Sequence, residues 1–104
     1  MKPSLELLIE DIKFDIIEIE NTSESDFKKV YEIYTKLYDR FENLKEESFS
    51  SNDKFERFES YKKMYRNSGL NIENGIKNGL YTEHNFFQIK EDLKLLSTYL
   101  TILQ

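Results

Sequence analysis

The chain of 104 residues contains one histidine, His84, and no cysteine, tryptophan or alanine. Without cysteine there is neither a disulfide scaffold nor a thiolate metal site. A single histidine does not make a transition-metal cluster, and most acid–base and nucleophilic catalysis at neutral pH relies on histidine or cysteine. An enzyme built from this chain would have to use carboxylates, hydroxyls and lysines, so we expect no enzymatic activity, no metal and no cofactor.

Residues that interrupt helices are also scarce. The chain has one proline and three glycines, and Val30 is its only valine, which argues against a β-sandwich. Ten isoleucines, twelve leucines, eight phenylalanines and seven tyrosines provide more apolar bulk than a disordered chain carries. We expect an all-α protein with one core, organised as a single domain over residues 1–104.

The apolar residues near the N-terminus are interrupted by Glu6, Glu10 and Asp11, so no signal-peptide core is expected there. No apolar run approaches the length of a membrane span. The frequent isoleucine, lysine, asparagine, phenylalanine and tyrosine residues indicate an AT-rich genome. We therefore expect a cytoplasmic protein, in a bacterial cell or in a phage-infected bacterial host, that does not interact with membranes.

The spacing of apolar residues predicts four helices, over residues 4–20, 24–47, 53–68 and 82–103. The second helix has the most regular stripe. Ser23 and Asp26 resemble the capping box that starts a helix. Four helices joined by short connections predict an antiparallel bundle.

Glycine determines where the third helix is predicted to end. Gly69 suits the left-handed position that follows a helix, with Leu70 folding back onto Tyr65. Residues 71–79 are the least regular stretch, and we expect a short extra helical turn there. Gly69, Gly75 and Gly79 do not have the spacing of a phosphate-binding loop or a dinucleotide fingerprint.

Negative charge is concentrated at the start of the chain. Residues 1–26 carry a net charge of −6, whereas the whole chain carries −5, so residues 27–104 carry +1. Asp11, Asp15 and Glu18 follow the spacing i, i+4, i+7 and therefore share one face of the first predicted helix. Phe14 and Ile17 lie outside the main apolar stripe of this helix and form a second strip.

The carboxylates of the first predicted helix have three possible roles. Paired carboxylates can act as acid and base or bind divalent ions, but a di-iron bundle needs a Glu-x-x-His on each of two helices, which this chain lacks. A solvated charged face is the structural alternative. An acidic docking surface for a basic partner is the functional interpretation that we favour.

Two further features have mainly structural interpretations. His84 falls in the first turn of the last predicted helix, where we expect it to be exposed or at the edge of the core. Residues 61–66 interleave aromatic and basic side chains, as nucleic-acid contacts often do, but helical spacing places Tyr61 and Tyr65 on a face of their own. Arg66 also lacks the histidine of a helical ribonuclease motif, since Asn71 stands in its place. With a pI near 4.9, nucleic-acid binding is not favoured.

These observations favour a small non-enzymatic protein that binds and inhibits, or regulates, a larger protein with a basic surface. The expected classes are an immunity protein or antitoxin for a bacterial toxin, or a phage-encoded inhibitor of a bacterial defence enzyme. Charge complementarity would speed encounter, and apolar anchors would supply affinity. The predicted partner-binding residues are Glu10, Asp11, Phe14, Asp15, Ile17 and Glu18.

Two alternatives remain open. The extra apolar strips of the first and last predicted helices could form a homodimer with a structural or regulatory role. Alternatively, a helical protein could bind nucleic acid, or act as an enzyme, through Lys62, Lys63 and Arg66.

Overall fold

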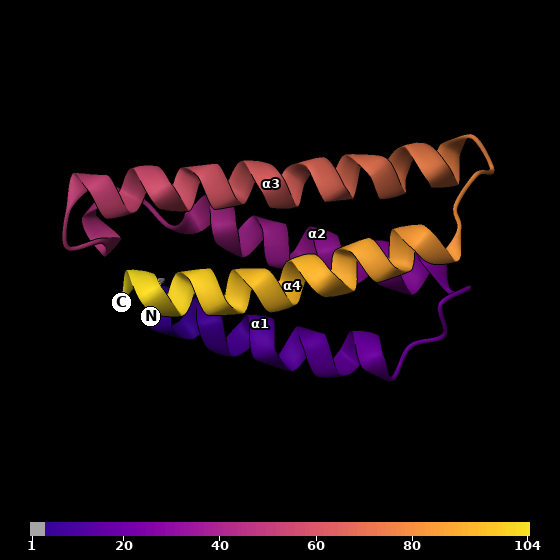
Figure 1. Ribbon diagram of the computed structural model, residues 1–104, viewed down its shortest axis with the longest axis horizontal. Coiled ribbons are helices and arrows are strands. Elements are labelled where there is room, and N and C mark those ends of the chain that lie inside the picture. Colours follow the sequence, from indigo (N-terminus) through magenta and orange to yellow (C-terminus); the bar gives the residue numbers. More distant parts are fainter. Residues whose placement is uncertain (1–3) are drawn as a thin grey trace.

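The computed structural model describes residues 4–104 and contains four α-helices. They are α1 (Leu5–Glu20), α2 (Phe27–Asn43), α3 (Asn52–Lys77) and α4 (Glu83–Leu103). A short 3-10 helix, η1 (Glu46–Ser48), lies between α2 and α3. The chain reverses direction at each connection between the α-helices, so that α1 begins and α4 ends at the same end of the molecule (Figure 1). The predicted all-α antiparallel bundle is confirmed.

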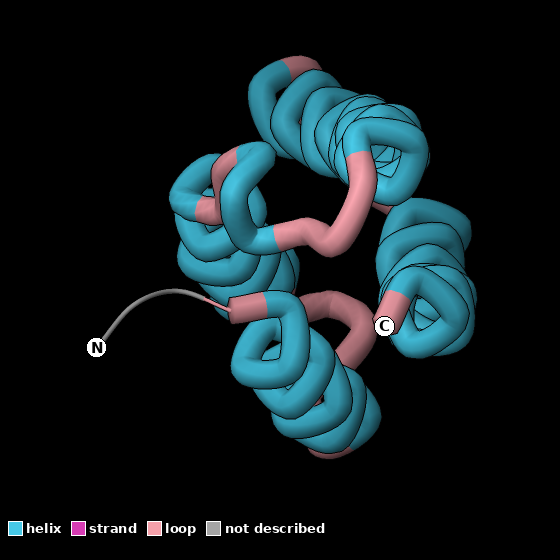
Figure 2. Tube along the Cα trace, turned by 90° about the vertical axis from the view of Figure 1, so that its left-hand side faces the viewer, coloured by secondary structure: helices cyan, strands magenta, loops and turns pink. Residues whose placement is uncertain are grey.

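The helices form a closed ring in sequence order. Each packs against the next, and α4 returns to pack against α1. Figure 2 shows the four helices nearly end-on around a common centre. The bundle measures 42 × 23 × 22 Å. Every helix therefore has two neighbours and one outward face.

The core is built from the stripes that the apolar spacing predicts. In α1 the buried apolar residues are Leu5, Leu8, Ile9, Ile12 and Ile19. In α2 they are Val30, Ile33, Tyr34, Leu37 and Phe41. In α4 they are Phe86, Ile89, Leu93, Leu96, Leu100 and Leu103.

Side-chain caps explain where the helices begin. In α2 the Asp26 carboxylate accepts a hydrogen bond from the Lys29 N–H at 3.2 Å, and the negative charge also suits a helix N-terminus. The predicted start at residue 24 with Ser23 as the cap was therefore wrong, because Asp26 takes this role. At the start of α4 the Thr82 N–H donates to Asn85 Oδ1 at 2.9 Å, which agrees with the predicted start at Thr82.

The other end of α2 also differs from the prediction, which placed it at residue 47. The helix ends at Asn43 because Leu44 takes an extended backbone conformation and is buried. This turn directs the chain toward η1 and the start of α3, where the Ser51 Oγ accepts from the Lys54 N–H at 3.2 Å.

The predicted end of the third helix at Gly69 was wrong, and the extra turn over residues 71–79 is not a separate element. Helix α3 passes through Gly69 without interruption and continues to Lys77. Gly69 is buried against the ring of Tyr34, and a Cβ at this position would overlap that ring. The glycine therefore serves a close approach of two helices.

The Schellman turn expected at Gly69 occurs at Gly79. Gly79 has a positive φ of 68°, and its N–H donates to the carbonyl of Ile76 at 3.2 Å. The Leu80 N–H donates to the carbonyl of Gly75 at 2.6 Å. These two hydrogen bonds end α3 and lead the chain into α4.

We predict that Gly69→Ala destabilises the protein. Alanine in a helix is normally better than glycine by about 1 kcal/mol. Overpacking a core typically costs about 1–3 kcal/mol, and the new Cβ would displace the Tyr34 ring, so we expect a net loss in the free energy of unfolding. Urea denaturation followed by circular dichroism measures the change.

The control is Asn67→Ala on an exposed position of α3, which should leave stability unchanged or slightly raised. In a Tyr34→Leu background, Gly69→Ala should cost much less, because the ring that it overlaps is gone. A stabilising Gly69→Ala in the wild-type background would contradict the close contact.

Candidate functional site

A groove of about 330 Å³ lies between the outward sides of α1 and α2. Four of the six predicted partner-binding residues line it, and they all come from α1. The lining residues are Asp11, Phe14, Asp15 and Glu18 from α1, with Lys29, Glu32, Ile33, Lys36 and Arg40 from α2.

The groove has opposite charges on its two walls. On α2, three basic residues with the spacing i, i+7, i+11 share one face, as the acidic residues of α1 do. Because α1 and α2 run antiparallel, Asp11 meets Arg40, with Asp11 Oδ2 and Arg40 Nε 3.2 Å apart. Four acidic and three basic side chains line the groove, which leaves a formal charge of −1. The acidic face of α1 is therefore partly neutralised by its own neighbour.

The basic wall was not predicted from the sequence, because the net charge of +1 over residues 27–104 does not show how these charges are distributed on α2. Lys29, Lys36 and Arg40 carry the signal, since they recur at helical spacing in the regular second helix. Two of them are already engaged. Arg40 pairs with Asp11, and Lys36 Nζ lies 3.0 Å from Glu32 Oε1 within α2.

Asp15 is the unusual residue of the groove. Its side chain is buried, with 8 % of the residue exposed, and no hydrogen bond or ion pair to its carboxyl occurs among residues 4–104. Burial raises the pKa of Asp15 to about 6, Arg40 lowers it, and Glu18 and Asp11 add to the rise. The carboxyl thus titrates closer to neutral pH than an ordinary aspartate does.

The remaining predicted residues of α1 face outward. Glu10 is exposed, and Ile17 is 57 % exposed, whereas Phe14 at the rim of the groove is 63 % exposed. Neither Glu10 nor Glu18 forms an ion pair within the described part of the chain. Exposed apolar side chains and acidic side chains without an ion pair therefore lie together on this surface.

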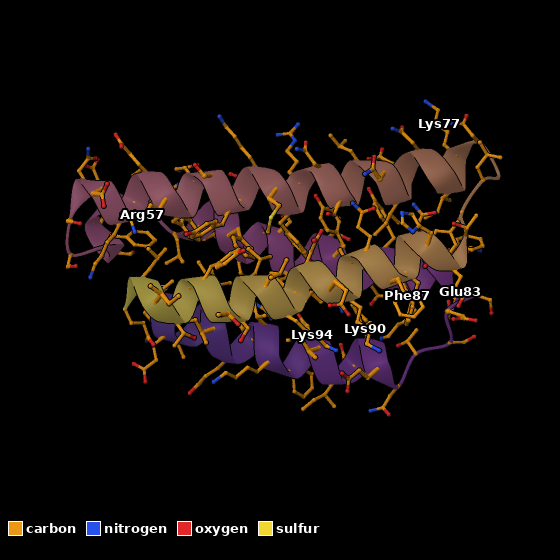
Figure 3. All side chains as sticks on the ribbon, viewed as in Figure 1. Arg57, Lys77, Glu83, Phe87, Lys90 and Lys94 are labelled. Atoms are coloured by element: carbon orange, nitrogen blue, oxygen red, sulfur yellow. The ribbon has the colours of Figure 1, made fainter. Side chains whose placement is uncertain are left out.

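Helix α4 contributes positive charge at the other edge of α1. Lys94 Nζ lies 3.9 Å from Glu20 Oε1, which joins α4 to the end of α1. Figure 3 shows Lys90 and Lys94 along the same stretch of α4, with Phe87 one turn before Lys90. Lys90 Nζ is 6.0 Å from the centroid of the Phe87 ring. The acidic helix is thus flanked by cations from both of its neighbours.

The aromatic and basic side chains of residues 61–66 divide as helical spacing predicts. Tyr65 is buried, and Tyr61 stacks on Tyr99 of α4 with ring centroids 4.9 Å apart. Lys62 Nζ lies 3.1 Å from Glu59 and 3.6 Å from Glu42, so its charge is balanced within the protein. This leaves less free positive charge for nucleic acid than the sequence suggested.

The remaining candidate features are His84, a metal site and a membrane-spanning helix. His84 is exposed in the first turn of α4. Within residues 4–104, no group of three or more histidine, aspartate and glutamate side chains is arranged to hold a metal ion. None of the helices in this part of the chain combines the length and the apolar character needed to cross a membrane.

We predict that the free energy of unfolding falls as the pH rises and Asp15 loses its proton. Its folded-state pKa of about 6 lies above the ordinary value of 3.8, so the folded protein binds the proton more tightly than the unfolded chain does. The stability contribution of the proton is complete below the unfolded-state value and is lost as the pH rises through about 6. Between about pH 3.5 and pH 7, the wild type should lose at most about 3 kcal/mol relative to Asp15→Asn, and less where solvent in the groove screens the carboxylate.

Chemical denaturation of both proteins across this pH range measures the difference. The control Asp11→Asn removes an exposed ion pair and should lower the free energy of unfolding at neutral pH by less than about 1 kcal/mol. If the free energies of unfolding of the wild type and Asp15→Asn differ by the same amount at every pH, this would contradict a buried, unpaired Asp15.

The comparisons with known proteins identify no family for this chain. It matches no protein-family model, and neither a curated protein nor a solved structure matches it.

Proposed function

We propose that this protein is a small non-enzymatic inhibitor or regulator that binds a basic partner protein through the outward side of α1. We name the contact surface the α1 face and define it as Glu10, Phe14, Ile17 and Glu18. The observation that carries the proposal is the exposure of Phe14 and Ile17 beside acidic residues that have no ion pair within residues 4–104.

The fold does not require these two apolar side chains. The core stripe of α1 is complete without Phe14 and Ile17, which point away from it. Burying an exposed side chain of this size contributes about 1.5–3 kcal/mol. An aromatic anchor surrounded by polar groups is also the usual arrangement of an interface that concentrates its affinity in a few residues.

The unpaired carboxylates indicate the kind of partner. Glu10 and Glu18 would attract a positively charged protein surface and accelerate encounter. Proteins that bind nucleic acid carry such surfaces, because they neutralise phosphates. Toxin nucleases and nucleic-acid-directed defence enzymes fit this chemistry, so an immunity protein, an antitoxin or a phage-encoded inhibitor remains the proposed class.

A homodimer is the second candidate, and the outward side of α4 favours it. Leu95 and Ile102 are exposed there with a spacing of two helical turns, and Ile102 is 69 % exposed. In this alternative, α4 rather than α1 provides the contact. The two candidates therefore predict sensitivity to different substitutions.

The first test is to identify the partner and then measure its affinity for surface variants. The tagged protein is crosslinked to its partner in cells of the source organism, and the captured protein is purified for isothermal titration. We expect Phe14→Ser with Ile17→Ser to weaken binding by at least about tenfold, since each side chain contributes more than about 1.4 kcal/mol. Glu10→Lys with Glu18→Lys should slow association and reduce its dependence on salt.

The matched control is Leu95→Ser with Ile102→Ser on α4. It removes comparable apolar area without touching α1, and it should leave partner affinity unchanged. If the α4 variant loses binding while the α1 variant keeps it, the α1 face is not the interface. If sedimentation shows a dimer that the α4 substitutions dissociate, the homodimer replaces the proposed function.

A further inference from the structure

We infer that the groove between α1 and α2 receives an arginine side chain of the basic partner, with the Asp15 carboxylate as its counter-ion. This inference deepens the proposed function and rests on it, because it specifies the chemistry that the partner must present. The inference concerns the groove. The α1 face shares Phe14 and Glu18 with the rim of the groove, whereas Glu10 and Ile17 lie outside it.

Asp15 is buried beside the groove and has no partner for its carboxyl group within residues 4–104. This side chain is more than nine-tenths buried, lines the groove, and has no hydrogen bond or ion pair within residues 4–104. A buried carboxylate without a partner is costly, and a cation of good geometry offsets that cost. The groove therefore has an acceptor for a cation that the protein itself leaves unused.

Two of the three cations that line the groove form ion pairs with acids other than Asp15. Arg40 directs its Nε to Asp11, and Lys36 directs its Nζ to Glu32. The residues that line the groove carry a formal charge of −1, so one incoming positive charge balances them. Asp15 is thus complementary to a single cation.

The shape of the groove favours arginine over lysine. A volume of about 330 Å³ accommodates a guanidinium group and part of its stem. The two oxygens of a carboxylate match the planar donors of a guanidinium, which is also more weakly hydrated than an ammonium group. The exposed ring of Phe14 lines the same groove, and guanidinium groups pack well on aromatic faces.

Several charged or titratable groups face Asp15 from the helices packed against it. Asp11 and Glu18 lie on α1, Lys36 and Arg40 on α2, and the Tyr65 hydroxyl comes from α3. Tyr65 donates to the carbonyl of Tyr34 at 3.5 Å, so its hydroxyl is engaged. Since burial raises the pKa of Asp15 to about 6, arginine should bind better above that pH than below it.

The test uses a single amino-acid probe, so it does not require the partner. N-acetyl-arginine amide is titrated into the carbon-13-labelled protein while the side-chain carboxyl signal of Asp15 is followed by NMR. We expect millimolar arginine amide to shift this signal and to lower the measured pKa of Asp15 by about one unit, equivalent to tenfold tighter binding to the ionised form. N-acetyl-citrulline amide, which has the same shape without the charge, should do neither.

Two variants make the assignment specific. Asp15→Asn should abolish the shifts that arginine amide causes in backbone signals along the groove. Asp39→Asn removes the same charge from an exposed position of α2 and should leave those shifts unchanged. N-acetyl-lysine amide, which carries the same charge on an ammonium group, should bind more weakly than N-acetyl-arginine amide.

The inference is overturned if citrulline amide causes the same shifts, or if Asp15 titrates below about pH 4 in the free protein, since Arg40 or Lys36 would then already neutralise it. The two proposals can fail separately. If the partner binds Asp15→Asn as tightly as the wild type, and arginine amide causes no shifts, the partner docks on the α1 face alone. Glu10 and Ile17 are the two residues of the α1 face that do not line the groove. If N-acetyl-arginine amide binds but Glu10→Lys with Ile17→Ser does not affect the partner, the groove site stands and the proposed interface does not.

Discussion

The ring of Tyr34 lies over Gly69, and this contact sets how closely α2 and α3 approach each other. Tyr65 packs beside it, with ring centroids 4.8 Å apart, and Phe41 continues the aromatic row at 5.3 Å from Tyr65. Because no side chain stands at Gly69, the Tyr34 ring fits against α3, which continues unbroken through this position for 26 residues. Helix α3 is therefore roughly 39 Å long, close to the 42 Å length of the bundle. It can contact α4 along most of the length of the bundle.

Helix α1 packs on the other helices through its buried apolar stripe, and an ion pair lies at each of its two edges. Arg40 of α2 pairs with Asp11, and Lys94 of α4 reaches Glu20. The acidic residues of α1 therefore divide into two groups, those that form an ion pair with a neighbouring helix and those that have none within residues 4–104. Asp15 belongs to the second group although it is buried, and its ionised form lowers stability near neutral pH. A protein that retains such a group and fills the groove on binding would exchange stability for recognition.

The sequence predicted best where periodicity was strongest. The buried stripes of α1, α2 and α4 follow from three- and four-residue spacing, because the apolar side of a helix must face the core. Its errors occurred where a local signal was overruled by a distant contact or competed with another local signal. Gly69 has the local signature of a helix end, yet the ring that requires this glycine comes from Tyr34, 35 positions earlier. Similarly, Ser23 and Asp26 are both good caps, and the chain uses Asp26.

The amino-acid sequence by itself determined the helical class, the apolar stripes and the acidic strip of α1, because these depend on spacing along one helix. It also determined the antiparallel arrangement, because the connections between the helices are short. The tertiary structure decided which charges remain free. Only the packing of α2 against α1 places Arg40 beside Asp11 and leaves Asp15 buried with no hydrogen bond or ion pair to residues 4–104. Burial and pairing depend on residues that are distant in the sequence, so the spacing within α1 could not distinguish a carboxylate that stabilises the fold from one that is available for binding.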